Sequence, residues 1–528
     1  MAERPWWEDA VIYQIYPRSF MDSSGDGIGD LNGIASRLGY LAALGIDAIW
    51  ISPFYRSPMV DFGYDICDYT AVDPRFGALE DFDNLMREAH ARGLRVILDF
   101  VPNHTSDRHP WFLQSRESRE NPLRDWYIWR NGKDGGPPNN WLSMFGGSAW
   151  SYDPQTEQYY YHAFLKEQPD LNWANPEVVA AMHDVLRFWL KRGVDGFRVD
   201  VLWHLAKDEL FRDEPDNPRW REGDDPYARL DHVYSCDQPG IQPIAHALRS
   251  TLSEFGDKVL IGELYLPMNR VVAYYGPDGT SGIHLPFNFH LLTTPWRAPA
   301  IADLIGAYEQ LLPQGAWPNW VFANHDRMRI ASRIGQRQAR VAAMLLLTLR
   351  GTPTLYYGDE LGLEDVPIPP ERVQDPWEKN VPGLGLGRDP VRTPMPWTPA
   401  QGHGFTAGMP WLPLNGDAPT RNVQSMEGEP RSILSLYRAL LRFRRAHPAL
   451  RRGSIAKVRT VGDVLIYERV AGAERMTIAL NLASTPSATL AIEGWLALST
   501  TTDDARAGAI TSLTLAPDEG VIVRHIAF

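Results

Sequence analysis

Acidic and basic residues directly follow several short apolar segments of this chain. GFRVDV places Arg198 and Asp200 two residues apart, so both side chains would point to the same side of a strand. IGEL places Glu263 at the end of a second apolar run, and ANHD places His325 and Asp326 after a third. One carboxylate can attack an anomeric carbon while a second carboxyl group protonates the leaving oxygen. The pattern therefore predicts acid–base chemistry on a glycosidic bond.

The two carboxyl groups of such a pair need different protonation states. We expect Arg198 to lower the pKa of Asp200, which would keep this nucleophile ionised. Glu263 lies between a glycine and a leucine, a less polar setting that favours the protonated acid. His104, after DFVPN, and His325 could donate hydrogen bonds to sugar hydroxyls. Asp200 is thus predicted as nucleophile and Glu263 as acid/base.

Eight short, β-rich runs recur along the chain, and most precede a helical pattern. This alternation predicts an α/β fold, a (β/α)8 TIM barrel, whose catalytic residues gather at the carboxyl ends of the strands. Residues 79–92 and 176–191 have the apolar spacing of helices and precede Gly93 and Gly193. The predicted strands are 11–16, 48–52, 95–101, 196–201, 259–263, 285–290, 320–323 and 354–357.

Two segments interrupt the alternation, and a third region ends it. Residues 104–170 are rich in Trp, Asn, Gly and Pro, which predicts an inserted, loop-rich subdomain after the third strand. Residues 362–424 form a second Pro/Gly-rich insertion. The barrel would then comprise 1–103 and 171–452, and short alternating runs predict a C-terminal antiparallel, sandwich-like β-domain over 453–528.

Bulk composition narrows the kinds of partner. The 528 residues carry a formal net charge of −13, with acidic and basic residues interspersed, which disfavours nucleic acid and anionic membranes. A neutral small molecule fits this surface better, whereas the oligomeric state stays open. The two cysteines, Cys67 and Cys236, lack metal-ligand spacing, and neither a secretion signal nor a membrane-length apolar run is visible. We therefore expect a cytoplasmic protein.

The segment DSSGDGIGD, residues 22–30, presents oxygen atoms at alternating positions. Such spacing is half of a calcium-loop pattern, but the twelfth position holds Gly33 instead of glutamate. A solvated Asp/Gly turn is the alternative interpretation. The candidate metal ligands are Asp22, Ser24, Asp26, the Ile28 carbonyl and Asp30.

Several long motifs resemble a known family. DFVPNH, GFRVD, the GE pair and NHD are similar, in this order, to the signature regions of glycoside hydrolase family 13, the α-amylase family. QPDLNW, at 168–173, resembles a further signature. WWEDAVIYQIYPRSF, GYDICDY and GRDPVRTPMPW are closest to the α-glucosidase and oligo-1,6-glucosidase branch. The resemblance extends over nearly the whole chain.

This resemblance implies an exo-acting, retaining α-glucosidase with transglucosylation activity, a structural Ca²⁺ or Mg²⁺ at 22–30 and no organic cofactor. Asp200 would form the glucosyl-enzyme, Glu263 would act as acid and then base, and Asp326 would bind the 2- and 3-hydroxyls. Asp65 and Arg392 would close the pocket beyond the terminal glucose. Phe145 and Phe164 would be pocket walls, although ordinary packing explains them equally. The implied substrate-binding residues are Asp65, Tyr64, His104, Phe145, Phe164, Arg198, His325 and Arg392.

Two departures from the family bear on substrate preference. Arg327 and Met328 follow NHD where relatives have Gln-Pro, beside the site for the leaving group. Val201, directly after the predicted nucleophile, is similar to the residue found in relatives that accept α-1,6 linkages. In the metal loop, Ser24 stands where relatives usually have Asn. The choice among α-1,4, α-1,6 and α-1,1 linkages, and between hydrolysis and transfer, therefore stays open.

Two other functions occur on chains that resemble this one. A glucosyltransferase or isomerase acting on sucrose-like donors would form the same glucosyl-enzyme, but the chain lacks the charged Arg-Leu-Asp-Arg-Asp loop of sucrose isomerases. Transporter subunits of this fold have a membrane span and degraded carboxylates, and this chain has neither feature.

Overall fold

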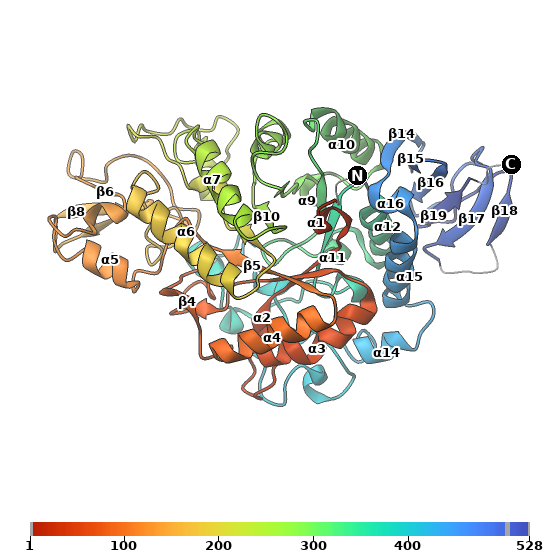
Figure 1. Ribbon diagram of the computed structural model, residues 1–528, viewed down its shortest axis with the longest axis horizontal. Coiled ribbons are helices and arrows are strands. Elements are labelled where there is room, and N and C mark those ends of the chain that lie inside the picture. Colours follow the sequence, from red (N-terminus) through yellow and green to blue (C-terminus); the bar gives the residue numbers. More distant parts are fainter. Residues whose placement is uncertain (1–3, 502–506, 526–528) are drawn as a thin grey trace.

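A computed structural model describes residues 4–501 and 507–525, and at its centre lies an eight-stranded parallel sheet (Figure 1). Its strands are β1 (Ile12–Ile15), β2 (Ala48–Ile51), β5 (Arg95–Phe100), β9 (Gly196–Val199), β10 (Val259–Gly262), β11 (Leu285–Pro286), β12 (Asn319–Val321) and β13 (Thr352–Tyr356). Their order is β11-β10-β9-β5-β2-β1-β13-β12. The predicted (β/α)8 barrel is confirmed.

The strands of this sheet are short, and both of their faces are buried. Every residue of β1, β2, β9 and β10 is buried, as expected where side chains fill a barrel interior on one face and meet helices on the other. β11 is shorter than predicted, because the chain turns at Asn288, whose side chain accepts from the His290 amide. Asn319 links the two end strands: its side chain accepts from the Asn288 amide and donates to the Pro286 carbonyl.

A long helix follows each strand except β10, after which α8 (Met268–Val271) is short. The predicted helix at 79–92 is confirmed as α4, whose buried residues include Phe82, Leu85 and Met86. The predicted helix at 176–191 is also confirmed, since Asn175 caps α6 by accepting from the Glu177 amide. The long helices are α3 (Leu31–Leu44), α4 (Leu79–Ala91), α6 (Pro176–Lys191), α7 (Ile241–Ser253), α10 (Ala298–Leu311), α12 (Gln336–Thr348) and α15 (Ile433–Ala446).

The remaining barrel elements are short and lie mostly in the loops. They are α1 (Trp6–Asp9), α2 (Pro17–Phe20), β3 (Tyr55–Arg56), β4 (Asp68–Val72), η2 (Leu202–His204), η3 (Pro226–Arg229), η4 (Val272–Tyr275), α9 (His290–Thr293), α11 (Ile330–Ile334), η5 (Asp359–Leu361), η6 (Pro370–Arg372), α13 (Pro376–Asn380), η7 (Asp389–Val391), η8 (Gln401–Gly404), α14 (Val423–Glu427) and α16 (Pro448–Arg452). The segment between β5 and α6 adds α5 (Pro110–Ser115), η1 (Arg124–Trp126) and a three-stranded sheet of β6 (Trp129–Arg130), β7 (Trp150–Asp153) and β8 (Gln158–Tyr161).

The C-terminal region forms a six-stranded antiparallel sheet at one end of the molecule (Figure 1). Its strands are β14 (Ser454–Val461), β15 (Val464–Ala471), β16 (Glu474–Asn481), β17 (Gly494–Ser499), β18 (Gly508–Ile510) and β19 (Gly520–Arg524). This agrees with the predicted antiparallel β-region, of which 502–506 and 526–528 lie outside the described residues, as do residues 1–3 of the N-terminus. In the described part of the chain, no helix is long and apolar enough to cross a bilayer.

Candidate active site

A cavity of about 380 Å³ opens at the carboxyl ends of the barrel strands. Most of the residues predicted from the sequence line it: Tyr64, His104, Phe145, Phe164, Asp200, Glu263, His325 and Asp326. Further lining residues include Asp61, Trp203, Tyr227, Tyr265, Arg327, Trp377 and Arg388. Arg198, Asp65 and Arg392 lie behind this surface and bind residues that form it.

The two predicted catalytic carboxyl groups are held by one arginine. Arg198 is fully buried on β9, and its Nη1 donates to Asp99 at 2.7 Å and to Asp200 at 2.8 Å. Its Nη2 lies 2.7 Å from Oε2 of Glu263, which also accepts from the Val201 amide at 2.9 Å. Because both carboxyls contact the same guanidinium, they are close together, as a retaining double displacement requires.

Burial dominates the protonation of this pair. It raises the pKa of Asp200 well above its usual range, and the charge of Arg198 lowers this pKa only in part, because Glu263 and Asp99 raise it further. Burial likewise raises the pKa of Glu263. The expectation that Arg198 gives Asp200 a depressed pKa is therefore wrong in its net direction. Since the paired carboxyls share one cation with Asp99, we infer that the site retains a proton near neutral pH.

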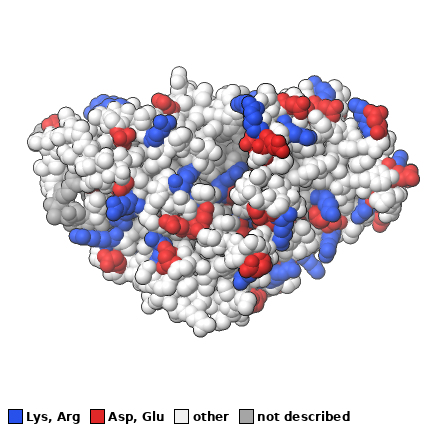
Figure 2. All heavy atoms as spheres, turned by 180° about the vertical axis from the view of Figure 1, so that it is seen from behind, with Lys and Arg blue, Asp and Glu red and all other residues white. Residues whose placement is uncertain are grey.

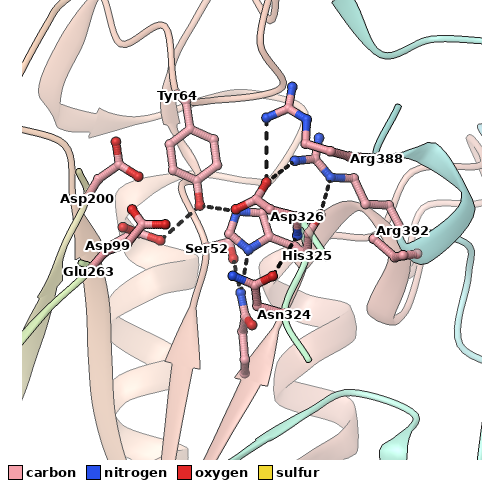
Figure 3. A network of polar contacts seen from close by, with 12 residues as sticks. Ser52, Tyr64, Asp99, Asp200, Glu263, Asn324, His325, Asp326, Arg388 and Arg392 are labelled. Carbon is pink, nitrogen blue, oxygen red and sulfur yellow. Dashed lines mark hydrogen bonds and ion pairs between the residues drawn. The ribbon is translucent and has the colours of Figure 1, made fainter. Parts of the chain in front are cut away.

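A chain of polar contacts orients His325 (Figure 3). The Gln14 amide nitrogen lies 2.8 Å from Nδ1 of His325, and the Tyr64 hydroxyl lies 2.6 Å from Nε2. Tyr64 donates in turn to Asp99 at 3.1 Å. Burial lowers the pKa of His325 well below its usual range, so this ring is neutral with its proton on Nε2. Tyr64, an implied substrate-binding residue, packs its ring against His325 with ring centroids 5.4 Å apart and also lines the cavity.

Asp326 is held as an anion by two arginines. Arg392 donates to its Oδ1 at 2.8 Å, and a nitrogen of Arg388 lies 3.5 Å from the same oxygen (Figure 3). Burial alone would raise the pKa of Asp326, but His325, Arg392 and Arg388 hold it well below its usual range. An anion here can accept hydrogen bonds from sugar hydroxyls and can stabilise positive charge that develops at the anomeric centre.

The pair that closes the cavity differs from the predicted pair of Asp65 and Arg392. Asp65 does not line the cavity, because its carboxylate accepts from the Val60 and Asp61 amides at 2.8 and 3.0 Å. Arg392 is occupied by the His325 carbonyl at 2.7 Å and by Asp326.

Asp61 and Arg388 line the cavity instead, 2.6 Å apart. Asp375 receives two further hydrogen bonds from the Arg388 guanidinium, at 2.8 and 2.9 Å, and so fixes its orientation. The repeated arginine of GRDPVR and the first acidic residue of DFGYD were the available signals for this pair.

A second buried network, not predicted from the sequence, supports His104. Gln168 places its amide nitrogen 3.1 Å from Nε2 of His104 and 3.2 Å from a carboxylate oxygen of Asp61. Behind it, Lys207 and Asp170 form a buried ion pair of 2.7 Å. Burial lowers the pKa of His104 to about 4, so the ring is neutral. The match of QPDLNW to a family signature was the only indication of Gln168 and Asp170.

Aromatic side chains form the walls predicted for the inserted segment. Phe145 and Phe164 both line the cavity, with ring centroids 5.9 Å apart. Trp377 packs on Phe145 at 5.3 Å, and the Arg388 guanidinium lies 4.9 Å from the same ring. Apolar faces of this kind suit the C–H face of a pyranose ring.

The loop predicted to bind a metal is closed by hydrogen bonds. Asp22 accepts from the Gly25 and Gly27 amides at 2.7 and 2.8 Å, and Asp30 accepts from the Gly33 amide at 2.7 Å. Among the described residues, no three His, Cys, Asp or Glu side chains are grouped so that they could hold a metal ion. The ion stays a prediction that rests on spacing, and no catalytic step depends on it.

A (β/α)8 barrel with two adjacent carboxyl groups and a third, anionic carboxylate at its carboxyl end is the architecture of a glycoside hydrolase. Comparison with known proteins gives the family. Residues 14–453 match the model of the α-amylase catalytic domain. The chain belongs to the α-amylase family, as the motifs predicted.

Individual relatives agree with this assignment. The chain is 44% identical to the "Probable alpha-glucosidase" of Rhizobium meliloti (strain 1021), over 91% of this chain and 90% of the relative. It is 37% identical to the oligo-1,6-glucosidase of Parageobacillus thermoglucosidasius, over 91% of each chain. Among solved structures, the α-glucosyl transfer enzyme XgtA superposes with a TM-score of 0.94 at 43% identity, covering 99% of this chain and 100% of that one. Trehalulose synthase MutB of Pseudomonas mesoacidophila MX-45 superposes with a TM-score of 0.90 at 35% identity, covering 99% of this chain and 100% of that one.

Proposed function

We propose that this protein is an exo-acting, retaining α-glucosidase that removes terminal glucose from short oligosaccharides or disaccharides. The observation that carries the proposal is the ion pair between Asp61 and Arg388, which closes the cavity that contains Asp200 and Glu263. A cavity closed beyond one sugar admits a chain end and excludes the middle of a polysaccharide. The relatives named α-glucosidase and oligo-1,6-glucosidase support this substrate class.

The reaction follows from the positions of the two carboxyl groups. A carboxylate oxygen of Asp200 attacks the anomeric carbon while the glycosidic bond breaks, and Glu263 gives its proton to the leaving oxygen. Glu263, now ionised, takes a proton from water as the water oxygen attacks the same carbon and Asp200 leaves. Two inversions restore the α-configuration. The anionic Asp326 opposes the positive charge that develops in both transition states.

The acceptor in the second step decides between hydrolysis and transfer. Water and a sugar hydroxyl can both be deprotonated by Glu263, so we expect transglucosylation at high substrate concentration. XgtA and MutB, named as a glucosyl transfer enzyme and a trehalulose synthase, support transfer as the second candidate activity.

A time course of products tests the proposal. Maltose, isomaltose, trehalose and sucrose would each be supplied at low and high concentration, and the anomeric form of the released glucose followed by NMR. We expect α-glucose from at least one disaccharide, with longer products at high concentration. Release of β-glucose would overturn the retaining mechanism, and cleavage within long starch chains would overturn exo-action.

We further propose a cytoplasmic location. Cys67 and Cys236 are both free, as expected in a reducing compartment. On the face shown in Figure 2, basic and acidic residues are interspersed, which fits a protein that works on a neutral solute. Fractionation of the source cells tests this location. Activity in the periplasmic or secreted fraction would contradict it.

A further inference from the structure

A second hollow lies beside the catalytic cavity. This groove, of about 440 Å³, shares three lining residues with the cavity: Tyr265, Leu266 and Arg327. Tyr265 comes two residues after Glu263, and Arg327 comes directly after Asp326. Because Glu263 protonates the leaving oxygen in the proposed reaction, a wall next to it faces the leaving group. The remaining groove residues are Leu264, Pro267, Phe289, His290, Leu292, Thr293, Met328 and Arg333.

Arg327 presents an unpaired cation to both hollows. Its guanidinium carbon lies 4.7 Å from the centre of the Tyr265 ring. It takes part in no ion pair within the described parts of the chain, 4–501 and 507–525, although most arginines near the cavity do. Tyr265 has the largest effect on the pKa of Arg327, which it raises in part through a side-chain hydrogen bond, and Asp326 and Glu263 raise this pKa only through space. A guanidinium stacked on a ring is oriented and retains free donors for a ligand.

The groove combines this cation with apolar walls and a second positive charge. Phe289 stacks on Tyr265 with ring centroids 4.4 Å apart, and Met328 is 54% exposed. Arg333 also lines the groove; burial lowers its pKa to about 10, so it is a cation at neutral pH. No Asp or Glu is among the groove residues. An apolar surface with two arginines and no carboxylate favours an anionic, partly apolar ligand.

We propose that this groove is a binding site for the leaving group, or for the acceptor in transfer, when that molecule carries a carboxylate on an aromatic or apolar body. Arg327 is its specificity-determining residue. The proposal rests on the α-glucosidase activity inferred above and adds the chemical class of the aglycone. Glucose occupies the closed cavity, the aglycone leaves over Tyr265, and its carboxylate meets Arg327.

A matched pair of substrates tests this site. The 4-carboxyphenyl and 4-carbamoylphenyl α-glucosides differ in charge but hardly in shape, and kcat/KM would be measured for both. The ratio of the two values would then be compared between wild type and Arg327→Gln, so that intrinsic leaving-group differences cancel. We expect the charged substrate to lose about fivefold to tenfold relative to the neutral one in Arg327→Gln. Arg327→Lys should retain most of the wild-type ratio.

Arg87→Gln is the control, because Arg87 is exposed on α4 and donates to Asn84 of the same helix. Added salt should move the wild-type ratio toward that of Arg327→Gln, since screening weakens an exposed charge pair. An unchanged ratio in Arg327→Gln, with the neutral substrate still hydrolysed, would overturn the groove and leave the proposed function intact. If the enzyme hydrolysed none of the two aryl glucosides, maltose, isomaltose, trehalose and sucrose, the proposed function and this inference would both be overturned.

Discussion

Asp61 and Arg388 form a buried ion pair of 2.6 Å across 327 positions of the chain. Asp61 belongs to the loop after β3, and Arg388 belongs to the long insertion after β13. The pair joins these two loops over the cavity, and Asp375 holds the arginine from behind. Exo-action would thus depend on two loops that are remote in sequence.

We expect Asp61→Asn and Asp65→Asn to have opposite signatures. Asp61 lines the cavity, so Asp61→Asn should raise the KM for maltose about tenfold to a hundredfold, the effect of losing a charge-assisted hydrogen bond. Asp65 holds backbone amides, so Asp65→Asn should mainly lower the melting temperature. Steady-state kinetics and thermal unfolding of both variants check this. If KM rose more in Asp65→Asn than in Asp61→Asn, Asp65 would be the residue that contacts the sugar, as the sequence predicted.

The two carboxyl groups of the catalytic pair should respond differently to the leaving group. Asp200→Ala should reduce turnover about 10⁴-fold on every substrate, because no covalent intermediate can form. Glu263→Gln should reduce turnover of maltose by about 10²-fold to 10⁴-fold but that of 4-nitrophenyl α-glucoside much less, since nitrophenolate leaves without a proton.

Circular dichroism of both variants should match that of the wild type. Azide should accelerate the second step of Glu263→Gln and yield a glucosyl azide, because this nucleophile needs no general base. Near-normal turnover of maltose by either variant would refute the assigned roles.

The predicted metal loop can be tested through stability. If residues 22–30 bind Ca²⁺ or Mg²⁺, a concentration of 100 times Kd should stabilise the fold by about 2.7 kcal/mol. The melting temperature of the wild type should then rise with added ion and fall with a chelator, with little change in turnover. Asp22→Ala should lose this response. If neither the ion nor the chelator changed the melting temperature of the wild type, the prediction of a metal site would be wrong.

Asp359 provides a prediction for the pH dependence of stability. Burial raises the pKa of this carboxyl to about 7, so the folded state binds its proton more tightly than the unfolded state does. The resulting stabilisation is complete below about pH 4 and is lost as the pH rises to about 7, by at most about 1.4 kcal/mol per pH unit.

Asp359→Asn cannot titrate at this position, and its amide oxygen can still accept from the Tyr356 amide. The variant should therefore gain stability relative to the wild type between pH 4 and pH 7. Urea unfolding midpoints of both proteins across this range check the sign. A difference that stays constant with pH, or that favours the wild type as the pH rises, would contradict the raised pKa.

Local sequence determined the elements and the residues at their ends. Apolar runs followed by glycine-terminated helical patterns predict the eight strands and their helices, because both faces of a barrel strand must be buried. Asp200, Glu263, His325 and Asp326 could be found because polar residues at the end of a buried strand need a partner or a function. The sequence also indicated the unusual Arg327.

Tertiary structure decided which neighbours those residues meet. Asp61 and Asp65 are both acidic residues of one loop, and only the fold shows that the second is occupied by backbone amides. The fold also distinguishes Arg388 from Arg392, because Arg388 alone forms ion pairs with Asp61 and Asp375. Whether the pKa of Asp200 is raised or lowered depends on burial and on three other carboxyl groups. The spacing of two residues between Arg198 and Asp200 gives no information about either. Desolvation and contacts between distant loops are properties of the folded chain, and local sequence does not encode them separately.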